Sequence, residues 1–143
     1  REWQEGRQTK KGMNPYRKAL EFATRKHAGQ RRRNGDNFII HPIRVSQEVK
    51  TEKQKVIALL HDVLEDTDAT YEELKELFGV DVAHTVHVLT REKDEQYSDY
   101  IQRVRTNPDA VAVKIADIAD NLSDTPSKEA IIKSAKAITE LVL

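Results

Sequence analysis

Apolar residues recur along this chain with the period of an α-helix. The clearest stripe has the spacing i, i+3, i+4, i+7 and i+8, which predicts a helix with one face in the core. Its members are Val56, Leu59, Leu60, Val63 and Leu64. Similar stripes run through residues 16–27, 74–78, 82–89 and 111–122. Because strand-length segments of alternating polarity are absent, the pattern predicts an all-α fold of about seven or eight helices.

Several helix ends are marked by capping residues. Asn14 and Asn107 each precede a proline, which combines an N-cap side chain with a residue that suits the first helical turn. Thr70 and Glu73 have the spacing of a capping box, and Gly79 suits the end of the helix that they begin. The first helix is predicted to end at Gly29, and further helices to begin at Pro42, Asp94 and Thr125-Pro126.

Length and composition narrow the class of protein. A chain of 143 residues suits one domain. Lys plus Arg and Asp plus Glu both number 24, so no net charge attracts the chain to nucleic acid or to a membrane surface. The absence of cysteine excludes disulfides, thiolate catalysis and cysteine-based zinc sites. Without an apolar run of about 18 residues or a signal segment, a cytoplasmic location is predicted.

The first residues differ in character from the remainder. Residues 1–12 are polar, do not begin with Met and precede Met13. We therefore predict that residues 1–12 form an expression leader or a disordered arm, and that residues 13–143 form the domain.

The chemistry is expected where the clearest apolar stripe ends, at His61, Asp62, Glu65 and Asp66. Side chains three and four positions apart share a helix face, so Glu65 is expected beside both His61 and Asp62. Three carboxylates repel one another unless a cation or a strong hydrogen-bond network offsets their charge. A divalent metal ion is the simplest such cation.

Two further ligands are predicted elsewhere in the chain. Asp117 belongs to a polar stripe that also contains Lys114, Asp120, Asn121 and Asp124. Such a stripe usually faces solvent, but its pairing with the His61-Asp62 dipeptide favours a ligand role for Asp117. His41 stands before a proline in the apolar run 38–42, where an unpaired imidazole would be unfavourable and rigid backbone could hold a ligand.

The remaining histidines are predicted to have other roles. His27 shares the apolar stripe of the first helix and is expected to be a packed or hydrogen-bonded core residue. His84 and His87 lie three apart, a spacing that can bind metal, but the apolar stripe of their helix turns them towards solvent. We therefore expect both at the surface.

Three adjacent arginines, Arg31, Arg32 and Arg33, stand in a loop that ends in Asn34 and Gly35. Most charge runs are simply solvated. Beside a metal site, however, guanidinium groups can bind phosphate oxygens in pairs and stack on a nucleobase. This loop is therefore a candidate for nucleotide recognition.

These motifs follow one another in a recognisable order. They are His27 to Gln30, Arg32-Arg33, Phe38 to Pro42, Leu59 to Thr67, and Lys114 to Asp117 with Asn121-Leu122. In this set, from Asn14 to about Thr125, the sequence resembles the HD-domain hydrolases of the guanosine tetra- and pentaphosphate alarmones, in their small stand-alone form. The resemblance implies a single HD-domain helical bundle without a synthetase or regulatory domain.

The resemblance also implies a set of roles. One metal ion, usually manganese and less expectedly iron or zinc, would be bound by His41, His61, Asp62 and Asp117. Glu65 and Asp66 would position and activate the attacking water. Arg32 would stack on the base, and Arg33 and Asn121 would help to hold the nucleotide. The implied reaction is hydrolysis of the 3′-diphosphate of a guanosine polyphosphate to GDP or GTP and pyrophosphate, which lowers alarmone levels in the stringent response.

The chain departs from this family pattern at a few positions. Ile118 stands where many relatives have Lys or Arg, and Ser123 and Asp124 stand where many have a basic residue and Thr. Two alternatives therefore remain open: an HD phosphohydrolase acting on another phosphorylated nucleotide, and a nucleotide-binding module without turnover. The expected partner is a guanine nucleotide, not nucleic acid or a membrane, and a homo-oligomer is compatible with the sequence.

Overall fold

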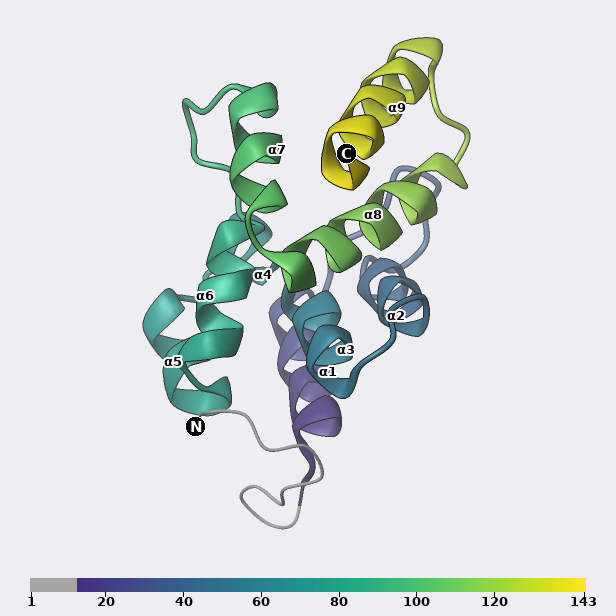
Figure 1. Ribbon diagram of the computed structural model, residues 1–143. Helices are drawn as coiled ribbons and strands as arrows, with labels where there is room; N and C mark the ends of the chain where they lie inside the picture. Colours follow the sequence, from purple (N-terminus) through teal and green to yellow (C-terminus); the bar gives the residue numbers. More distant parts are fainter. Residues whose placement is uncertain (1–12) are drawn as a thin grey trace.

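The computed structural model describes residues 13–143, which form nine α-helices (Figure 1). The helices are α1 (Pro15–Lys26), α2 (Ile40–Gln47), α3 (Glu52–Leu60), α4 (Val63–Asp66), α5 (Tyr71–Phe78), α6 (Val80–Val88), α7 (Tyr97–Arg105), α8 (Pro108–Leu122) and α9 (Lys128–Val142). The all-α prediction is confirmed. The β-structure of the described residues is limited to one isolated bridge between Arg31 and Asn37. The predicted leader or arm, residues 1–12, lies outside the described residues.

The predicted capping signals form as expected. The side chains of Asn14 and Asn107 accept hydrogen bonds from backbone N–H groups three residues ahead, at the starts of α1 and α8. Thr70 and Glu73 make both bonds of a capping box at the start of α5. Gly79 ends α5 with φ of 93°, a left-handed value that glycine adopts without steric cost.

Two early helix boundaries differ from those predicted. Helix α1 ends at Lys26, because His27 already has non-helical dihedrals and Gly29 turns the chain with φ of 86°. Helix α2 begins at Ile40, so Pro42 lies within its first turn, where the missing N–H needs no helical partner.

Two late boundaries are also displaced. Helix α7 begins at Tyr97 instead of Asp94, because the preceding loop is held by side-chain hydrogen bonds from Arg103. Helix α9 begins at Lys128, because the side chain of Ser127 caps it whereas Thr125 has φ of 45° and leaves the helical region.

Helix α3 lies at the centre of the fold. Every residue from Val56 to Leu60 is fully buried, so its apolar surface extends around the helix and not only along the predicted stripe. It packs against α1, α2, α6 and α8 (Figure 1). The end of α3 therefore brings His61 into the middle of the molecule.

Helix α8 crosses the core and is covered on more sides than predicted. It contacts α2, α3, α6, α7 and α9. Ala119, which falls within the predicted apolar stripe of residues 111–122, is exposed, whereas Asp117 and Asp120 from the polar stripe are buried. The polar face of α8 is thus an interior surface, which places its carboxylates against α2 and the end of α3.

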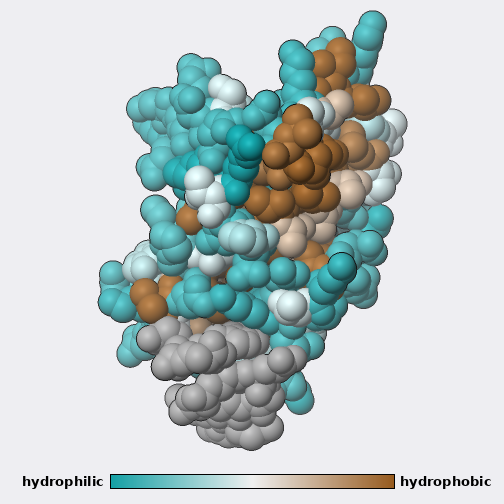
Figure 2. Space-filling model, in the orientation of Figure 1, coloured by the Kyte–Doolittle hydropathy of each residue, from teal (hydrophilic) through white to brown (hydrophobic). Residues whose placement is uncertain are grey.

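Helix α9 is the least covered of the long helices. Only Ala137 and Leu141 of its side chains are buried. Figure 2 shows an apolar patch on the face of the molecule that is seen in Figure 1. The exposed large apolar residues of α9 and the C-terminus are Ile131, Ile132, Val142 and Leu143. Within residues 13–143, no helix combines the length and apolar character required to cross a membrane.

Candidate metal centre and active site

His61 is placed by the end of α3. The helix stops at Leu60, and the Nδ1 atom of His61 lies 2.6 Å from the carbonyl oxygen of Ala58. A carbonyl oxygen only accepts, so Nδ1 carries a proton and donates it. In the neutral ring Nε2 therefore holds a lone pair. This atom is buried and has no hydrogen-bond partner among the described residues.

His41, in the first turn of α2, is held through both of its ring nitrogens. Its Nδ1 atom lies 2.7 Å from Oδ2 of Asp120, and its Nε2 atom lies 2.8 Å from Oδ1 of Asp117. The ring is 3% exposed and lies edge-on to that of His61, with ring centres 5.2 Å apart. The Nε2 atoms of both histidines therefore face one small region.

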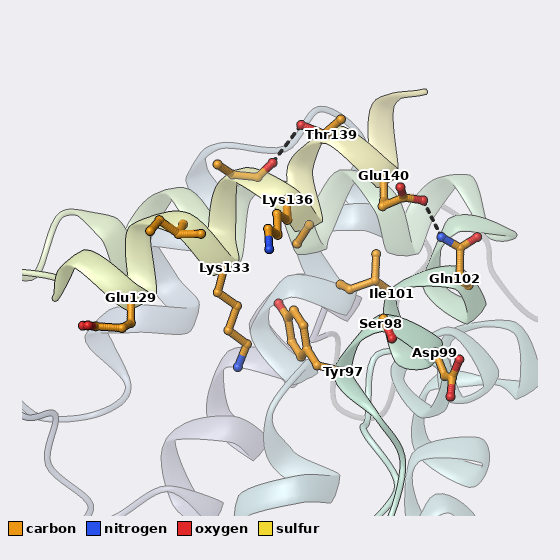
Figure 3. Close-up of a pocket in the computed structure, with 13 residues that line it drawn as sticks. Tyr97, Ser98, Asp99, Ile101, Gln102, Glu129, Lys133, Lys136, Thr139 and Glu140 are labelled. Carbon is orange, nitrogen blue, oxygen red and sulfur yellow. Dashed lines mark hydrogen bonds between the residues drawn. The ribbon is translucent and has the colours of Figure 1, made fainter.

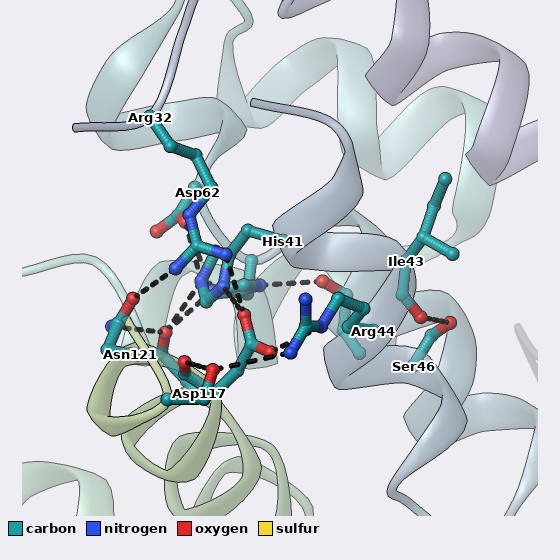
Figure 4. Close-up of polar contacts among 12 residues, drawn as sticks. Arg32, His41, Ile43, Arg44, Ser46, Asp62, Asp117 and Asn121 are labelled. Carbon is teal, nitrogen blue, oxygen red and sulfur yellow. Dashed lines mark hydrogen bonds and ion pairs between the residues drawn. The ribbon is translucent and has the colours of Figure 1, made fainter. Parts of the chain in front are cut away.

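The carboxylates of Asp62 and Asp117 also border this region (Figure 4). Oδ1 of Asp117 is 3.4 Å from Nε2 of His61, and Oδ2 of Asp62 is 3.1 Å from the same nitrogen and 3.7 Å from Nε2 of His41. Ligand atoms about 2.1 Å from an ion and at right angles to each other are about 3 Å apart, so these separations suit a shared metal ion. The ligand atoms of His41, His61 and Asp117 lie within 4.8 Å of one another.

The electrostatics of the cluster also favour a positive charge among its side chains. Burial disfavours the charged form of His61, but the carboxylates of Asp62 and Asp117 outweigh burial and raise the pKa of its imidazole well above the usual value. Burial alone would raise the pKa of Asp117, but Lys114 and His61 hold it well below its usual range. Nζ of Lys114 lies 3.0 Å from Oδ2 of Asp117. A positive charge among these groups, a proton or a metal ion, is thus strongly favoured.

The predicted catalytic residues, Glu65 and Asp66, lie on the short helix α4 and not on one continuous helix with His61. The chain turns at His61 and Asp62 between α3 and α4, so the expected single helix through His61 and Glu65 is wrong, whereas the backbone N–H of Asp66 still bonds to the carbonyl oxygen of Asp62 in the helical i, i+4 pattern. Glu65 is exposed, and its Oε1 accepts a hydrogen bond of 3.1 Å from the backbone N–H of Arg91. Burial and the charges of Asp62 and Glu65 raise the pKa of Asp66 to about 6.

The three loop arginines have different partners. Arg32 donates to Oδ2 of Asp120 at 3.1 Å and to Oδ1 of Asn121 at 3.2 Å, and its side chain is 7% exposed. Arg33 instead donates to the backbone oxygen of Asp124 at 2.7 Å, and Arg31 to that of Gly35 at 3.1 Å. Only Arg32 therefore reaches the side chains around the metal cluster.

A pocket of about 400 Å³ opens beside these arginines. Its lining residues include the three arginines and Phe38, Asn121 of α8, Asp124 from the segment after α8, and Ala130 and Ser134 of α9. Asn121 connects the pocket to the metal cluster, because its Nδ2 donates to Oδ1 of Asp117 at 3.1 Å. The pocket thus offers guanidinium groups and an aromatic ring next to the candidate ligands.

Asp120 is a site residue that the sequence reasoning missed. It is 8% exposed, and its carboxylate contacts His41, Arg32 and Arg44. Its position one helical turn after Asp117 was the available signal, since residues three apart share a face. The sequence could not show that this polar face of α8 is turned inwards.

The other histidines lie where they were predicted. His27 is 2% exposed, and its Nδ1 lies 2.9 Å from Oε1 of Gln30. His84 and His87 are exposed. These three residues therefore lie outside the group of candidate ligands.

A larger cavity of about 900 Å³ lies between α7 and α9 (Figure 3). Its lining includes Tyr97, Ile101, Lys133 and Ala137, and Nζ of Lys133 lies 4.0 Å from the ring centre of Tyr97. None of the candidate ligands, catalytic residues or loop arginines lines it. Size alone is therefore a poor guide to the reactive centre in this fold.

Comparison with known proteins agrees with this geometry. Residues 19–118 match the model of the HD domain family. The chain is 40% identical over 117 residues to an Aquifex aeolicus protein named guanosine-3′,5′-bis(diphosphate) 3′-pyrophosphohydrolase, covering 73% of this chain but only 17% of that protein. It is 34% identical over 122 residues to the Drosophila melanogaster protein of the same name, MESH1, covering 76% of this chain and 68% of that protein.

A solved structure is also similar. It is described as a metazoan ortholog of SpoT that hydrolyses ppGpp, and it aligns with a TM-score of 0.74 and 29% identity over 94% of this chain and 86% of the other. The match to the family model covers most of the chain, and the match to MESH1 covers more than two thirds of that relative. The chain therefore belongs to the HD domain family.

Proposed function

We propose that this chain is a metal-dependent hydrolase that removes the 3′-diphosphate from a guanosine polyphosphate, giving GDP or GTP and pyrophosphate. The observation that carries the proposal is the convergence of two imidazole Nε2 atoms and two carboxylates on one point beside an arginine-lined pocket. The names of the Aquifex and Drosophila relatives support the substrate. A role in lowering alarmone levels and a cytoplasmic location are part of the same proposal.

The donor set supports manganese as the metal. Two imidazoles and two carboxylates suit manganese or iron better than magnesium, which prefers oxygen ligands and retains several waters. When bound, such an ion lowers the pKa of a water molecule and offsets charge on phosphoryl oxygens. His41, His61, Asp62 and Asp117 would hold it.

The remaining roles belong to the protein's own side chains. In the reaction a water oxygen bonds to the phosphorus next to O3′ of the ribose, the bond between that phosphorus and O3′ breaks, and O3′ gains a proton. Glu65 and Asp66 would orient the water and accept its proton, which requires them to be ionised. Arg32, Arg33 and Asn121 line the pocket and would hold the nucleotide.

The positions that depart from the family pattern bear unequally on substrate choice. Ile118 is 4% exposed in the core, so its side chain is not available to a nucleotide. Ser123 donates to the backbone oxygen of Asp120 and accepts from Arg44, whereas Asp124 lines the pocket. Asp124 is thus the departure that can affect the substrate, and an enzyme for another phosphorylated nucleotide is the second candidate.

A panel of nucleotides tests both candidates. Guanosine 3′,5′-bis(diphosphate), GTP, GDP and other purine nucleotides would be incubated with the protein, and released pyrophosphate and orthophosphate would be measured separately. We expect pyrophosphate from the 3′-diphosphate substrate only, loss of activity with EDTA, and recovery with manganese. His61→Ala should be inactive, whereas His84→Ala, an exposed histidine outside the cluster, should retain activity. Full activity of the metal-free protein would contradict the proposal.

A turnover assay separates these enzymes from a binding module. The protein would be mixed in excess over radiolabelled substrate in the presence of manganese. Binding without product formation in a single turnover would support a module that lacks catalysis.

A further inference from the structure

Asp120 occupies an unusual position in the hydrogen-bond network around the candidate metal ligands. Its Oδ2 atom lies 2.7 Å from Nδ1 of His41 and 3.1 Å from a guanidinium nitrogen of Arg32. Its Oδ1 atom lies 2.8 Å from Nε of Arg44. One buried carboxylate from α8 thus contacts the α2 histidine and two arginines from separate segments.

These contacts close into a ring of five side chains. From Asp117, the ring passes through Nε2 and Nδ1 of His41 to Asp120, and then to Arg32. It continues from Arg32 to Asn121 and returns from Asn121 to the same Oδ1 atom of Asp117. Figure 4 shows Arg32 reaching from its loop towards Asn121 and Asp117 of α8, with His41 beside them. The ring connects a nucleotide-pocket residue to a candidate metal ligand.

The two histidines of the cluster have unequal partners. The Nδ1 atom of His61 faces the neutral carbonyl of Ala58, whereas that of His41 faces a carboxylate. A carboxylate on the far nitrogen fixes the tautomer and ring orientation of a metal-ligating histidine and makes it a stronger base. Removal of such a partner typically weakens metal binding by about 10-fold to 100-fold.

The charge of Asp120 is compensated locally. A third carboxylate beside Asp62 and Asp117 would be unfavourable alone, but two guanidinium groups contact its two oxygens. Arg32 and Asp120 are both less than a tenth exposed, whereas the side chain of Arg44 is 48% exposed. The Asp120 carboxylate is therefore placed to accept a hydrogen bond from the Nδ1–H group of His41.

We propose that Asp120 is the positioning residue of the metal centre: it holds His41 in the tautomer and orientation needed for metal binding and links that histidine to Arg32. This inference rests on the proposed function, because it assumes that His41 binds a metal ion. Asp120 itself lies behind the imidazole and does not contact the reacting atoms.

The test is the manganese affinity of the full chain with Asp120→Asn, measured by titration calorimetry and by the electron paramagnetic resonance signal of free Mn²⁺. We expect affinity to fall by about 10-fold to 100-fold. Arg44→Ala also removes a contact of Asp120 but leaves the His41 contact, so its affinity should change by less than about fivefold, the scale of an exposed ion pair. Asp99→Asn, an exposed position on α7, controls for the loss of one negative charge.

Activity measured across manganese concentrations completes the test. If Asp120 positions His41, saturating manganese should restore most of the kcat of Asp120→Asn, and circular dichroism should show a native helical spectrum. A wild-type affinity in Asp120→Asn would overturn the inference while leaving the proposed function intact. An equal loss in Arg44→Ala would also overturn it, since it would assign the effect to packing of the arginines. Failure of the wild-type chain to bind manganese would instead count against the proposed function.

Discussion

Arg103 holds the loop between α6 and α7, and its removal should affect both stability and catalysis. Its guanidinium donates to the backbone oxygens of Val88 and Thr90, each at 3.0 Å. It also donates to both carboxylate oxygens of Glu95, to Oε2 at 3.0 Å and to Oε1 at 2.7 Å. This pairing is the main reason that the pKa of Glu95 falls to about 2. We predict that Arg103→Ala loosens this loop.

The size of the effect follows from the contacts that are lost. The two bonds to backbone oxygens contribute about 1 kcal/mol each. The pairing with Glu95 adds about 1 kcal/mol or less, because the side chain of Arg103 is 30% exposed and solvent screens the charges. The free energy of unfolding should therefore fall by about 2–3 kcal/mol. For a domain of this size, that change lowers Tm by roughly 4 to 12 °C.

The loop also carries the backbone N–H of Arg91 that binds Glu65. Loss of Arg103 should therefore reduce kcat by about tenfold, less than the ~100-fold expected when a positioned acid–base group is removed. Urea unfolding and steady-state kinetics at saturating manganese would measure the two effects. Arg105→Ala is the matched control. Arg105 is exposed, and the hydrogen bond described for its side chain is a long one, 3.4 Å, to the side chain of Gln102. Equal urea midpoints for the two variants would refute the reasoning.

Three further predictions concern the site. Glu65→Gln should retain metal and nucleotide affinity but lower kcat by about 100-fold or more; loss of metal in calorimetry would instead make Glu65 a ligand. Arg32→Lys should raise KM because an ammonium cannot donate to Asp120 and Asn121 with a planar fork, whereas Arg31→Lys should be nearly silent; equal KM values at low and high salt would exclude a specific role. The raised pKa of Asp66, about 6 against about 4 in an unfolded chain, means that stability is lost as pH rises through this interval. At pH 7, the metal-free Asp66→Asn variant should therefore have a higher urea midpoint of unfolding than the metal-free wild type. At pH 3.5 the two midpoints should be equal, and a difference that persists at this pH would contradict the reasoning.

Local signals predicted the helices well because they act over a few residues. The Asn14 and Asn107 caps and the capping box at Thr70 are formed by neighbouring side chains and backbone, so the sequence contains what is needed to predict them. The break after Leu60 was not predictable from periodicity, because the apolar spacing of Val63 and Leu64 continues the stripe across it.

The candidate ligands were found by residue type and motif, and the neighbours behind them were not. His41, His61 and Asp117 were each predicted as ligands, and the structure brings them together, with Asp62 adjacent. Asp120 was assigned to an ordinary polar face, because a single helix pattern cannot show that both faces of α8 are covered. Similarly, the spacing of the arginines could not show that Arg32 turns inwards while Arg33 binds the backbone at Asp124.

The candidate ligands come from parts of the chain that are far apart in sequence: α2, the turn after α3, and α8. An ion bound there is a cross-link that closes two long loops of the polypeptide, and such closure disfavours the unfolded chain. Binding to the folded state alone adds about 2.7 kcal/mol of stability when free metal is 100 times its Kd. We therefore expect metal supply to govern how long the folded molecule survives in the cell, as well as how fast it works. Scarcity of the ion would then lower the population of folded molecules as well as the occupancy of the site.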